Sequence, residues 1–540
     1  MQELRTTSQL CYPAPMSVTA ESAPPAPAGR AGRRGHPWLT LASVALGVIM
    51  VGLDGSVVAI ANPVIGEDLG ASLSQLQWIT NAYLLTLGVT LILAGKLGDR
   101  YGRRLMFLVG VVGFGLASAG IGLIGSTTGV IALRVVQGAF GALLMPNSLA
   151  ILRATFPPEK LNMAIGIWGG SSAISVALGP IVGGLLVEHV SWESVFFLNL
   201  PIAAIALVIG ASVLAESRSH AEQHPDLPGI ALLGAGLFAI VFGLIKAQEW
   251  GWTSASTLGF LIGGIALLVA FGLVEARTRF ALLPMRLFRN RSLSIGTATI
   301  LVGFLGMFGV LFFLTLYLQN VHGYSPVQAG VRLLPLSLSM MFGSPLGGVL
   351  TEKLGPRPPL VAGLALLGAA LLLMTGLEPD SSYGSLWPPL VMVGLGLGFV
   401  ITASAEAIVG NAPVDDAGVA SGLQSTAIQV GGVMGTAILG SILAGQVGSV
   451  LFEKLTAAGV PAALARQLEG AKELVGQGAA PVQGVPADLQ AAVVTGSHEA
   501  FMAGLHTSML VGGILALAAA AAALFVQRTE LPEAAAAAAA

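Results

Sequence analysis

The sequence predicts an all-α integral membrane protein with fourteen membrane-spanning helices. Of its 540 residues, 54% are hydrophobic and only 10% are charged, whereas soluble domains carry roughly 25% charged residues. A single soluble core also stops growing at roughly 250–300 residues, so the apolar excess must face lipid. The apolar runs do not alternate with polar residues as the strands of membrane β-barrels do. Helices, which satisfy their own backbone hydrogen bonds, are therefore expected in the bilayer.

The composition also excludes several kinds of partner and site. A net charge of −2 argues against a nucleic-acid partner, because such proteins carry a clustered basic surface. The single cysteine, Cys11, excludes an internal disulfide and a cysteine-based metal centre. Of the seven histidines, only His220 and His224 have metal-like spacing, and solvation in a charged loop explains them better. No phosphate-binding loop of the Gly-x-x-x-x-Gly-Lys-Ser/Thr form is present, so we expect no cofactor and an ion gradient as energy source.

Fourteen apolar runs, bounded by charges or by Gly/Pro clusters, give the expected spans. Each approaches or exceeds the roughly 20 residues that a helix needs to cross a bilayer. In order, the runs cover residues 38–61, 76–95, 105–124, 129–152, 162–187, 194–214, 229–247, 256–275, 294–318, 327–350, 358–377, 387–411, 419–446 and 504–526.

The distribution of Lys and Arg orients these spans. With the N-terminus inside, nineteen of the 25 basic residues fall on the inner side, and only Lys454, Arg466 and Lys472 fall outside. Short outer connections instead carry acidic residues such as Glu67 and Asp68. We therefore expect a multi-pass protein of a bacterial cytoplasmic membrane with both termini in the cytoplasm.

An internal repeat divides the chain into two halves. The loops after the second and tenth spans share the pattern Gly, Leu, acid, base, Gly, Arg at a constant offset of 253 positions, from Gly95 to Gly348 onward. A second block, at an offset of 256, matches Gly179 with Gly435. Two blocks at nearly one offset predict a duplicated six-helix unit with the seventh and eighth spans inserted. Parallel repeats of this kind place a substrate site between two rocking halves, although a duplicated scaffold without transport is the alternative.

This division gives the expected domains. They are a disordered cytoplasmic tail at 1–37, an N-terminal six-helix bundle at 38–215, a linker with two inserted helices at 216–290, a C-terminal six-helix bundle at 291–530 with an external helical loop at about 449–500, and a low-complexity tail at 531–540.

Two charged residues lie deep inside expected spans. Asp54 is about fifteen residues into the first span, roughly 22 Å along the helix. Arg134 is about six residues into the fourth span, which enters from the outer side, so the two lie at similar depth. Ionisable groups at this depth usually mark ion or substrate paths. We expect Asp54 and Arg134 to pair and to couple transport to protons; a static structural ion pair is the alternative.

The two repeated loops are candidate cytoplasmic latches. Glycines let the flanking helices approach closely, and an acid in the loop can cap a helix or pair across the bundle. Positive-inside anchoring alone is the alternative, but it does not explain the glycine–acid spacing. The candidate residues are Gly95, Asp99, Arg100, Gly102 and Arg103 in the first half, and Glu352, Lys353, Gly355 and Arg357 in the second.

Two further candidates lie in the fifth and twelfth spans. Gly179, Pro180, Gly183 and Gly184 form a motif that permits close helix contact and a bend, with ordinary small-residue packing as the alternative. Glu406 lies near the cytoplasmic end of its span, where it is a candidate substrate or proton site or else a solvated interfacial acid.

At these residues the chain resembles the major facilitator superfamily, in its fourteen-span drug:proton antiporter-2 branch, over nearly the whole length from Trp38 to Arg528. The segments that carry the resemblance are Leu53-Asp54-Gly-Ser-Val-Val, Gln77-Trp78, Tyr83, the Gly95-to-Arg104 loop, Leu133-Arg134-Val-Val-Gln137-Gly138, and Gly179-Pro180 with Gly183-Gly184. The resemblance implies the major facilitator fold, with proton-coupling roles for Asp54 and Arg134 and an exporter-associated role for the glycine motif.

Together, residues and resemblance predict a proton-driven exporter of amphipathic, hydrophobic antibiotics or toxic compounds, working by alternating access and conferring resistance. The expected partners are a small drug-like substrate, protons and the bilayer; an accessory export subunit is compatible with the sequence but not required by it. The alternatives are a proton-coupled transporter of a polar metabolite or siderophore, or a non-transporting membrane sensor or enzyme. We expect no enzyme activity, because no catalytic cluster is evident.

Overall fold

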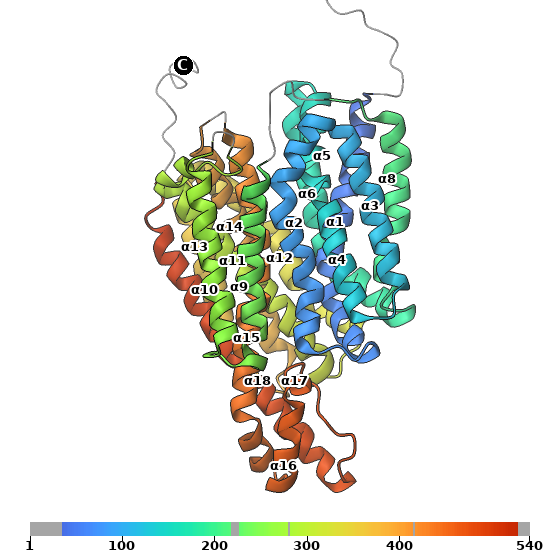
Figure 1. Cartoon of the computed structure of the whole chain (residues 1–540), viewed down its shortest axis with the longest axis vertical. Coiled ribbons are helices and arrows are strands. Elements are labelled where there is room, and N and C mark those ends of the chain that lie inside the picture. Colours follow the sequence, from blue (N-terminus) through green and yellow to red (C-terminus); the bar gives the residue numbers. More distant parts are fainter. Residues whose placement is uncertain (1–34, 218–225, 279–280, 414–415, 528–540) are drawn as a thin grey trace, which may run out of the picture.

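The computed structural model describes residues 35–217, 226–278, 281–413 and 416–527. Over these ranges the regular elements are all helices, which confirms the predicted all-α fold (Figure 1). Of the tail expected at 1–37, residues 1–34 lie outside the described residues, as does the tail expected at 531–540, and Pro37 already begins the first helix. Below, "basic end" means the end of the bundle where α2 and α12 terminate, and "distal end" means the opposite one.

The N-terminal half and the inserted pair come first along the chain. Their helices are α1 (Pro37–Asp68), α2 (Leu73–Tyr101), α3 (Arg103–Leu123), α4 (Thr127–Ala142), α5 (Leu144–Thr155), α6 (Pro158–His189), α7 (Ser194–Phe197) and α8 (Asn199–Val213), followed by α9 (Leu227–Trp250) and α10 (Ala255–Glu275).

The C-terminal half follows. Its helices are α11 (Arg291–Leu316), α12 (Pro326–Leu354), α13 (Arg357–Met374), α14 (Tyr383–Ala405), α15 (Ala417–Ala457), the short α16 (Ala462–Leu468) and α17 (Lys472–Val475), and α18 (Ala487–Ala523). Single π-helical turns, Tyr317–Val321 and Glu406–Gly410, end α11 and α14.

Each of the fourteen expected spans overlaps a helix, but the count of fourteen is not confirmed. Within the described ranges, 12 helices are long and apolar enough to cross a membrane, and the bent helix α2 makes up to 13. The remaining segment belongs to α6, in which only Leu178–His189 stands out as a shorter apolar helix. The count of fourteen therefore stays a prediction.

The internal repeat is visible in how helices begin and end. Ser72 before α2 and Ser325 before α12 each form a capping box with the residue three positions on, in which side chains and backbone N–H groups bond reciprocally. Both helices end at a glycine with positive φ, 115° at Gly102 and 82° at Gly355, a conformation that other residues rarely adopt. These positions differ by the same 253 residues as the repeated loops.

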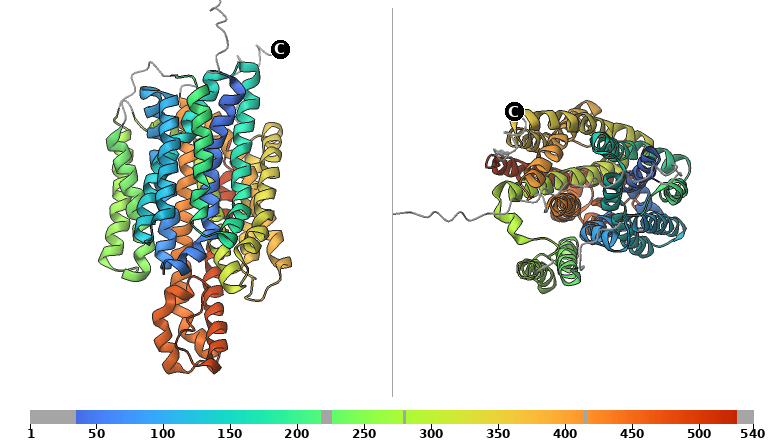
Figure 2. Two further views of the ribbon diagram at one scale, coloured as in Figure 1. Left: turned by 90° about the vertical axis from the view of Figure 1, so that its right-hand side faces the viewer. Right: turned by 90° about the horizontal axis from the view of Figure 1, so that it is seen from above.

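Residues 449–500 form a helical unit that projects from the distal end, which we call the projecting hairpin (Figures 1 and 2). The long helices α15 and α18 carry it outward, α16 lies at its far part, and α17 lies back near the start of α2 (Figure 1). It consists mainly of helix, in line with the expectation from its amphipathic stretches.

The inserted helices α9 and α10 pack on each other, and α9 also contacts α2 of the first half and α15 of the second (Figure 2). The pair is therefore attached to the outside of the bundle rather than built into either six-helix unit.

The two halves meet toward the distal end. Helix α6 packs against α12, and α2 packs against α15. Hydrogen bonds between the halves join Gln77 to the Thr436 carbonyl (3.2 Å), Gln319 to the Ile60 carbonyl (3.0 Å) and the Val327 N–H to Glu188 (3.0 Å), while Thr436 donates to Asn81 and Thr426 to the Gly88 carbonyl. The bonds of Gln77, Gln319 and Glu188 hold the distal end closed in this conformation, and that of Thr426 joins the halves near the middle of α2.

Candidate functional site

Asp54 on α1 and Arg134 on α4 form an ion pair in the middle of the first half. Asp54 is only 3% exposed and Arg134 only 1%. The predicted proximity of the two residues is therefore confirmed, while their part in proton coupling stays a prediction. An unpaired charge at this depth would be strongly destabilising, so each residue makes the burial of the other tolerable.

Three further polar side chains complete the network around Asp54. The side-chain amides of Gln137 and Asn199 both donate to Asp54 Oδ1, at 2.8 and 3.1 Å. The same two amides bond to the Ser118 hydroxyl oxygen, at 2.7 and 3.2 Å. These residues come from α1, α3, α4 and α8, so a change at Asp54 is transmitted to four helices.

Arg134 is held on its other side by backbone and aromatic groups. Its Nε donates to the Ile79 carbonyl at 2.9 Å, and its Nη1 also donates to Gln137 Oε1 at 2.7 Å. The guanidinium lies over the Tyr83 ring, 4.1 Å from the centroid, where the negative face of the ring attracts it. Arg134 therefore stays in place even if Asp54 is neutralised.

The hydrogen bonds of the network define what a proton on Asp54 would change. With Asp54 ionised, both charges of the network have a partner, and both side chains are buried. A proton on Asp54 removes one charge of the pair and converts an acceptor into a donor, so the bonds to Gln137, Asn199 and Arg134 must rearrange. The role of such a rearrangement in transport stays a prediction.

The first repeated loop is bonded within its own half. Asp99 forms an ion pair with Arg103 at 2.8 Å across the Gly102 turn. The backbone N–H of Arg104 donates to Glu216 Oε1 at 3.2 Å, and its guanidinium donates to the Ala211 carbonyl at 2.8 Å. The loop is therefore fastened to the end of α8, and its role as a latch between the halves stays a prediction for another conformation.

The second repeated loop is less tightly placed. Gly355 ends α12 with its positive φ, whereas Glu352, Lys353 and Arg357 are exposed at the basic end. Glu406 is also exposed, at the start of the π-helical turn after α14, and the structure does not bring it to the Asp54 network.

The glycine motif of α6 makes close contacts with both halves. Gly179 and Gly183 face Ser56 and Val57 on α1. Gly184 faces α12, where an added Cβ would stand 2.7 Å from the Pro326 carbonyl oxygen. The motif therefore lets α6 lie tightly between its own half and the other one at the distal end.

Gln477 in the projecting hairpin closes the distal end further. It is 8% exposed, and its Nε2 donates to the Ala71 carbonyl of the first half at 3.2 Å. Its own carbonyl accepts from Asn320 Nδ2 of the second half at 2.7 Å. One residue of the hairpin thus links the two halves.

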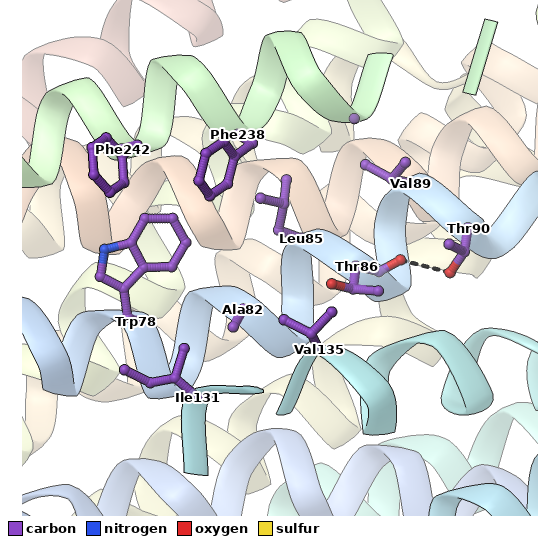
Figure 3. A pocket seen from close by; sticks show the side chains of 11 residues that line it. Trp78, Ala82, Leu85, Thr86, Val89, Thr90, Ile131, Val135, Phe238 and Phe242 are labelled. Carbon is purple, nitrogen blue, oxygen red and sulfur yellow. Dashed lines mark hydrogen bonds between the residues drawn. The ribbon is translucent and has the colours of Figure 1, made fainter. Parts of the chain in front are cut away.

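An apolar groove of about 550 Å³ lies between α2, α4 and the inserted helix α9 (Figure 3). Trp78, Phe238 and Phe242 supply aromatic faces, and the two phenylalanine rings stack with centroids 5.5 Å apart. The remaining lining residues are Ala82, Leu85, Thr86, Val89, Thr90, Ile131, Val135 and Gly234. Such a surface can accommodate a flat apolar molecule through stacking and burial of area.

The sequence identified the candidate residues, but it did not identify several of the residues that bond to them. Ser118 and Asn199 carry no charge and no motif, and their one signal was a polar side chain in an otherwise apolar span. Glu216 and Gln477 gave no signal at all, because their roles depend on which segment folds next to them.

Comparisons with known proteins agree with this architecture. A family model described as Major Facilitator Superfamily matches residues 44–436. The tetracenomycin C resistance and export protein of Streptomyces glaucescens is 48% identical over 506 residues, covering 93% of this chain and 94% of the relative. The multidrug efflux pump LfrA of Mycolicibacterium smegmatis is 32% identical over 489 residues, 90% and 95% of the two chains. The puromycin resistance protein of Streptomyces alboniger is 36% identical over 421 residues, 77% and 83%.

Among solved structures, a bacterial homologue of the human lysosomal transporter Spinster, in an inward-facing and occupied conformation, has a similar fold. The TM-score is 0.62 at 19% sequence identity, covering 91% of this chain and 96% of the other.

Proposed function

Because the chain belongs to the Major Facilitator Superfamily, a transporter family rather than a class of enzyme, we propose that it exports amphipathic, hydrophobic antibiotics or toxic compounds by exchange for protons. Its relatives are antibiotic resistance, export and multidrug efflux proteins of bacteria, similar over most of their length. The observation that carries the proton coupling is the buried pair of Asp54 and Arg134 inside one half.

The proposed cycle alternates between this conformation and a distal-open one. Here the distal end is closed by α6 against α12 and by Gln477, so substrate reaches the pathway from the basic end. We assign the basic end to the cytoplasm because Lys and Arg gather there. Opening the distal end exposes Asp54 to protons outside, and reclosing with the proton delivers it inward. One charge moving through 100 mV supplies about 2.3 kcal/mol.

The groove beside the inserted helix α9 supports a hydrophobic substrate. Its lining is mainly aromatic and aliphatic. We propose that it receives the exported compound from the bilayer before transfer to the space between the halves.

The deciding experiment uses inverted membrane vesicles that contain the full-length protein. Uptake of a panel of antibiotics and lipophilic cations is measured together with proton release, for wild type, Asp54→Asn and Asp488→Asn, an exposed acid in the projecting hairpin. We expect coupled uptake in wild type and in Asp488→Asn, and its loss in Asp54→Asn. Full proton-coupled uptake in Asp54→Asn would overturn the assignment of Asp54. Coupled uptake of polar metabolites alone would overturn the substrate class.

A further inference from the structure

A second cluster of buried charges lies at the basic end, outside the Asp54 network. Glu275, the last residue of α10, is only 2% exposed, and Asp226, which caps the start of α9, is only 7% exposed. Both are contributed by the inserted pair. Lys96 on α2 is the charged neighbour from the first half, and its Nζ donates to the Ala281 carbonyl at 3.4 Å.

Each carboxyl group has one satisfied oxygen. Glu275 Oε2 accepts from the Leu283 N–H at 2.8 Å, and Asp226 Oδ1 accepts from the Gly229 N–H at 2.9 Å. The second oxygens, Glu275 Oε1 and Asp226 Oδ2, are buried and have no hydrogen-bond donor.

The two unsatisfied oxygens point toward the same place. A Cβ added to Gly229 would lie under 3.0 Å from both of them, and the two carboxyl groups are within hydrogen-bonding reach of each other. Two ionised carboxylates in this position would repel each other, and each would bury an oxygen without a donor. A single proton between them removes the repulsion and satisfies both oxygens with one short hydrogen bond.

We propose that Asp226 and Glu275 together bind one proton, so that the inserted helices carry a second protonation site. The groups that face it are Lys96 from α2, the two acids from the α9–α10 pair, and the Leu283 N–H from the segment after α10. When the proton leaves toward water at the basic end, two negative charges face Lys96 on α2. The charge of the site therefore sets how strongly the inserted pair is attracted to Lys96 on α2. Lys96 lies three residues before Asp99.

The first test is the pH dependence of thermal unfolding of the purified full-length protein. A carboxyl pair that holds a proton in the folded state but not in the unfolded chain stabilises the fold at low pH and loses that effect as the pH rises. We expect Glu275→Gln to abolish this part of the slope, because an amide donates to Asp226 at every pH. Asp488→Asn is the matched control and should keep the wild-type slope. An unchanged slope in Glu275→Gln would overturn the proposal.

The second test detects the proton directly. The infrared difference spectrum between wild type and Glu275→Gln at pH 7 should contain the C=O band of one protonated carboxylic acid. Asp226→Asn, which can still cap α9, should remove the same band and serves if Glu275→Gln does not fold. Absence of that band from both difference spectra would show that the pair holds no proton. Stabilisation of the wild type by sodium chloride but not by choline chloride would show that a sodium ion binds there in place of the proton.

Discussion

Asn199 on α8 donates a hydrogen bond to Asp54 on α1, at 3.1 Å between Nδ2 and Oδ1. The two residues are 145 positions apart, and both are buried. The sixth span of the first half is thereby connected to the proposed proton site, although its sequence is otherwise apolar.

We expect Asn199→Leu to destabilise the protein by about 1–3 kcal/mol, because Asp54 and Ser118 lose a donor in a buried network. Thermal unfolding measures this loss. If Asn199 positions Asp54 for proton exchange, the pH profile of transport should also change, whereas a purely structural role would lower transport equally at every pH. Asn199→Asp is the harsher comparison, since it places a second carboxylate beside Asp54.

Arg134→Gln should destabilise the protein by about 3–5 kcal/mol, because it leaves the Asp54 charge buried without its ion-pair partner. The double variant Asp54→Asn/Arg134→Gln removes both charges and should recover most of the stability without recovering transport. Denaturation and vesicle uptake on the same four proteins separate the two effects. Recovery of proton-coupled transport in the double variant would contradict the proposed mechanism.

Gly184→Ala should weaken the distal closure, because the added methyl group collides with the Pro326–Val327 backbone of α12. With Cys11→Ser as background, a reporter cysteine at Ala71, which is 3% exposed, should become more reactive toward an impermeant thiol reagent. Gly170→Ala is the control on the same helix, because no atom lies within 4 Å of a Cβ there.

Gln477→Ala should act on the same closure from the projecting hairpin. It removes the hydrogen bond to the Ala71 carbonyl. This should lower the stability of the distal-closed conformation by about 0.5–1.5 kcal/mol. A several-fold rise in reactivity of the Ala71 reporter is expected. Gln483→Ala, at an exposed position of the hairpin, should leave the reactivity unchanged.

Phe238→Ala should reduce the transport of flat, aromatic compounds by several-fold through loss of stacking area in the groove. Phe342→Ala on α12 is the matched control, because Phe342 is also exposed, at 67%, but lies outside the groove. Equal losses in both variants would indicate a general effect of removing surface phenylalanines. Apparent affinity and maximal rate should be measured separately. If the groove binds the substrate first, Phe238→Ala should lower the apparent affinity more than the maximal rate.

The sequence allowed the helix positions and the central ion pair to be predicted, because both follow from local properties. Apolar length marks a span, and a charge inside one, as at Asp54 and Arg134, requires a partner at the same depth. The count of fourteen spans stays a prediction, because α6 stands out as an apolar helix only over Leu178–His189 within the described residues.

Long-range partners could not be predicted in the same way. Asn199, Gln477 and the Asp226–Glu275 pair depend on which helices lie side by side and on their rotation. The same holds for Glu216, because only the fold shows which backbone N–H its carboxylate accepts from.

The projecting hairpin has a mechanical consequence. Both of its supports, α15 and α18, belong to one half, and α15 alone has 41 residues, about 60 Å of continuous helix. A rigid arm of this length amplifies rotation, so a small tilt of the second half sweeps the hairpin tip over a much larger arc. A donor fluorophore at Ala463 and an acceptor at the turn between α1 and α2 would therefore form a sensitive gauge of the transport cycle.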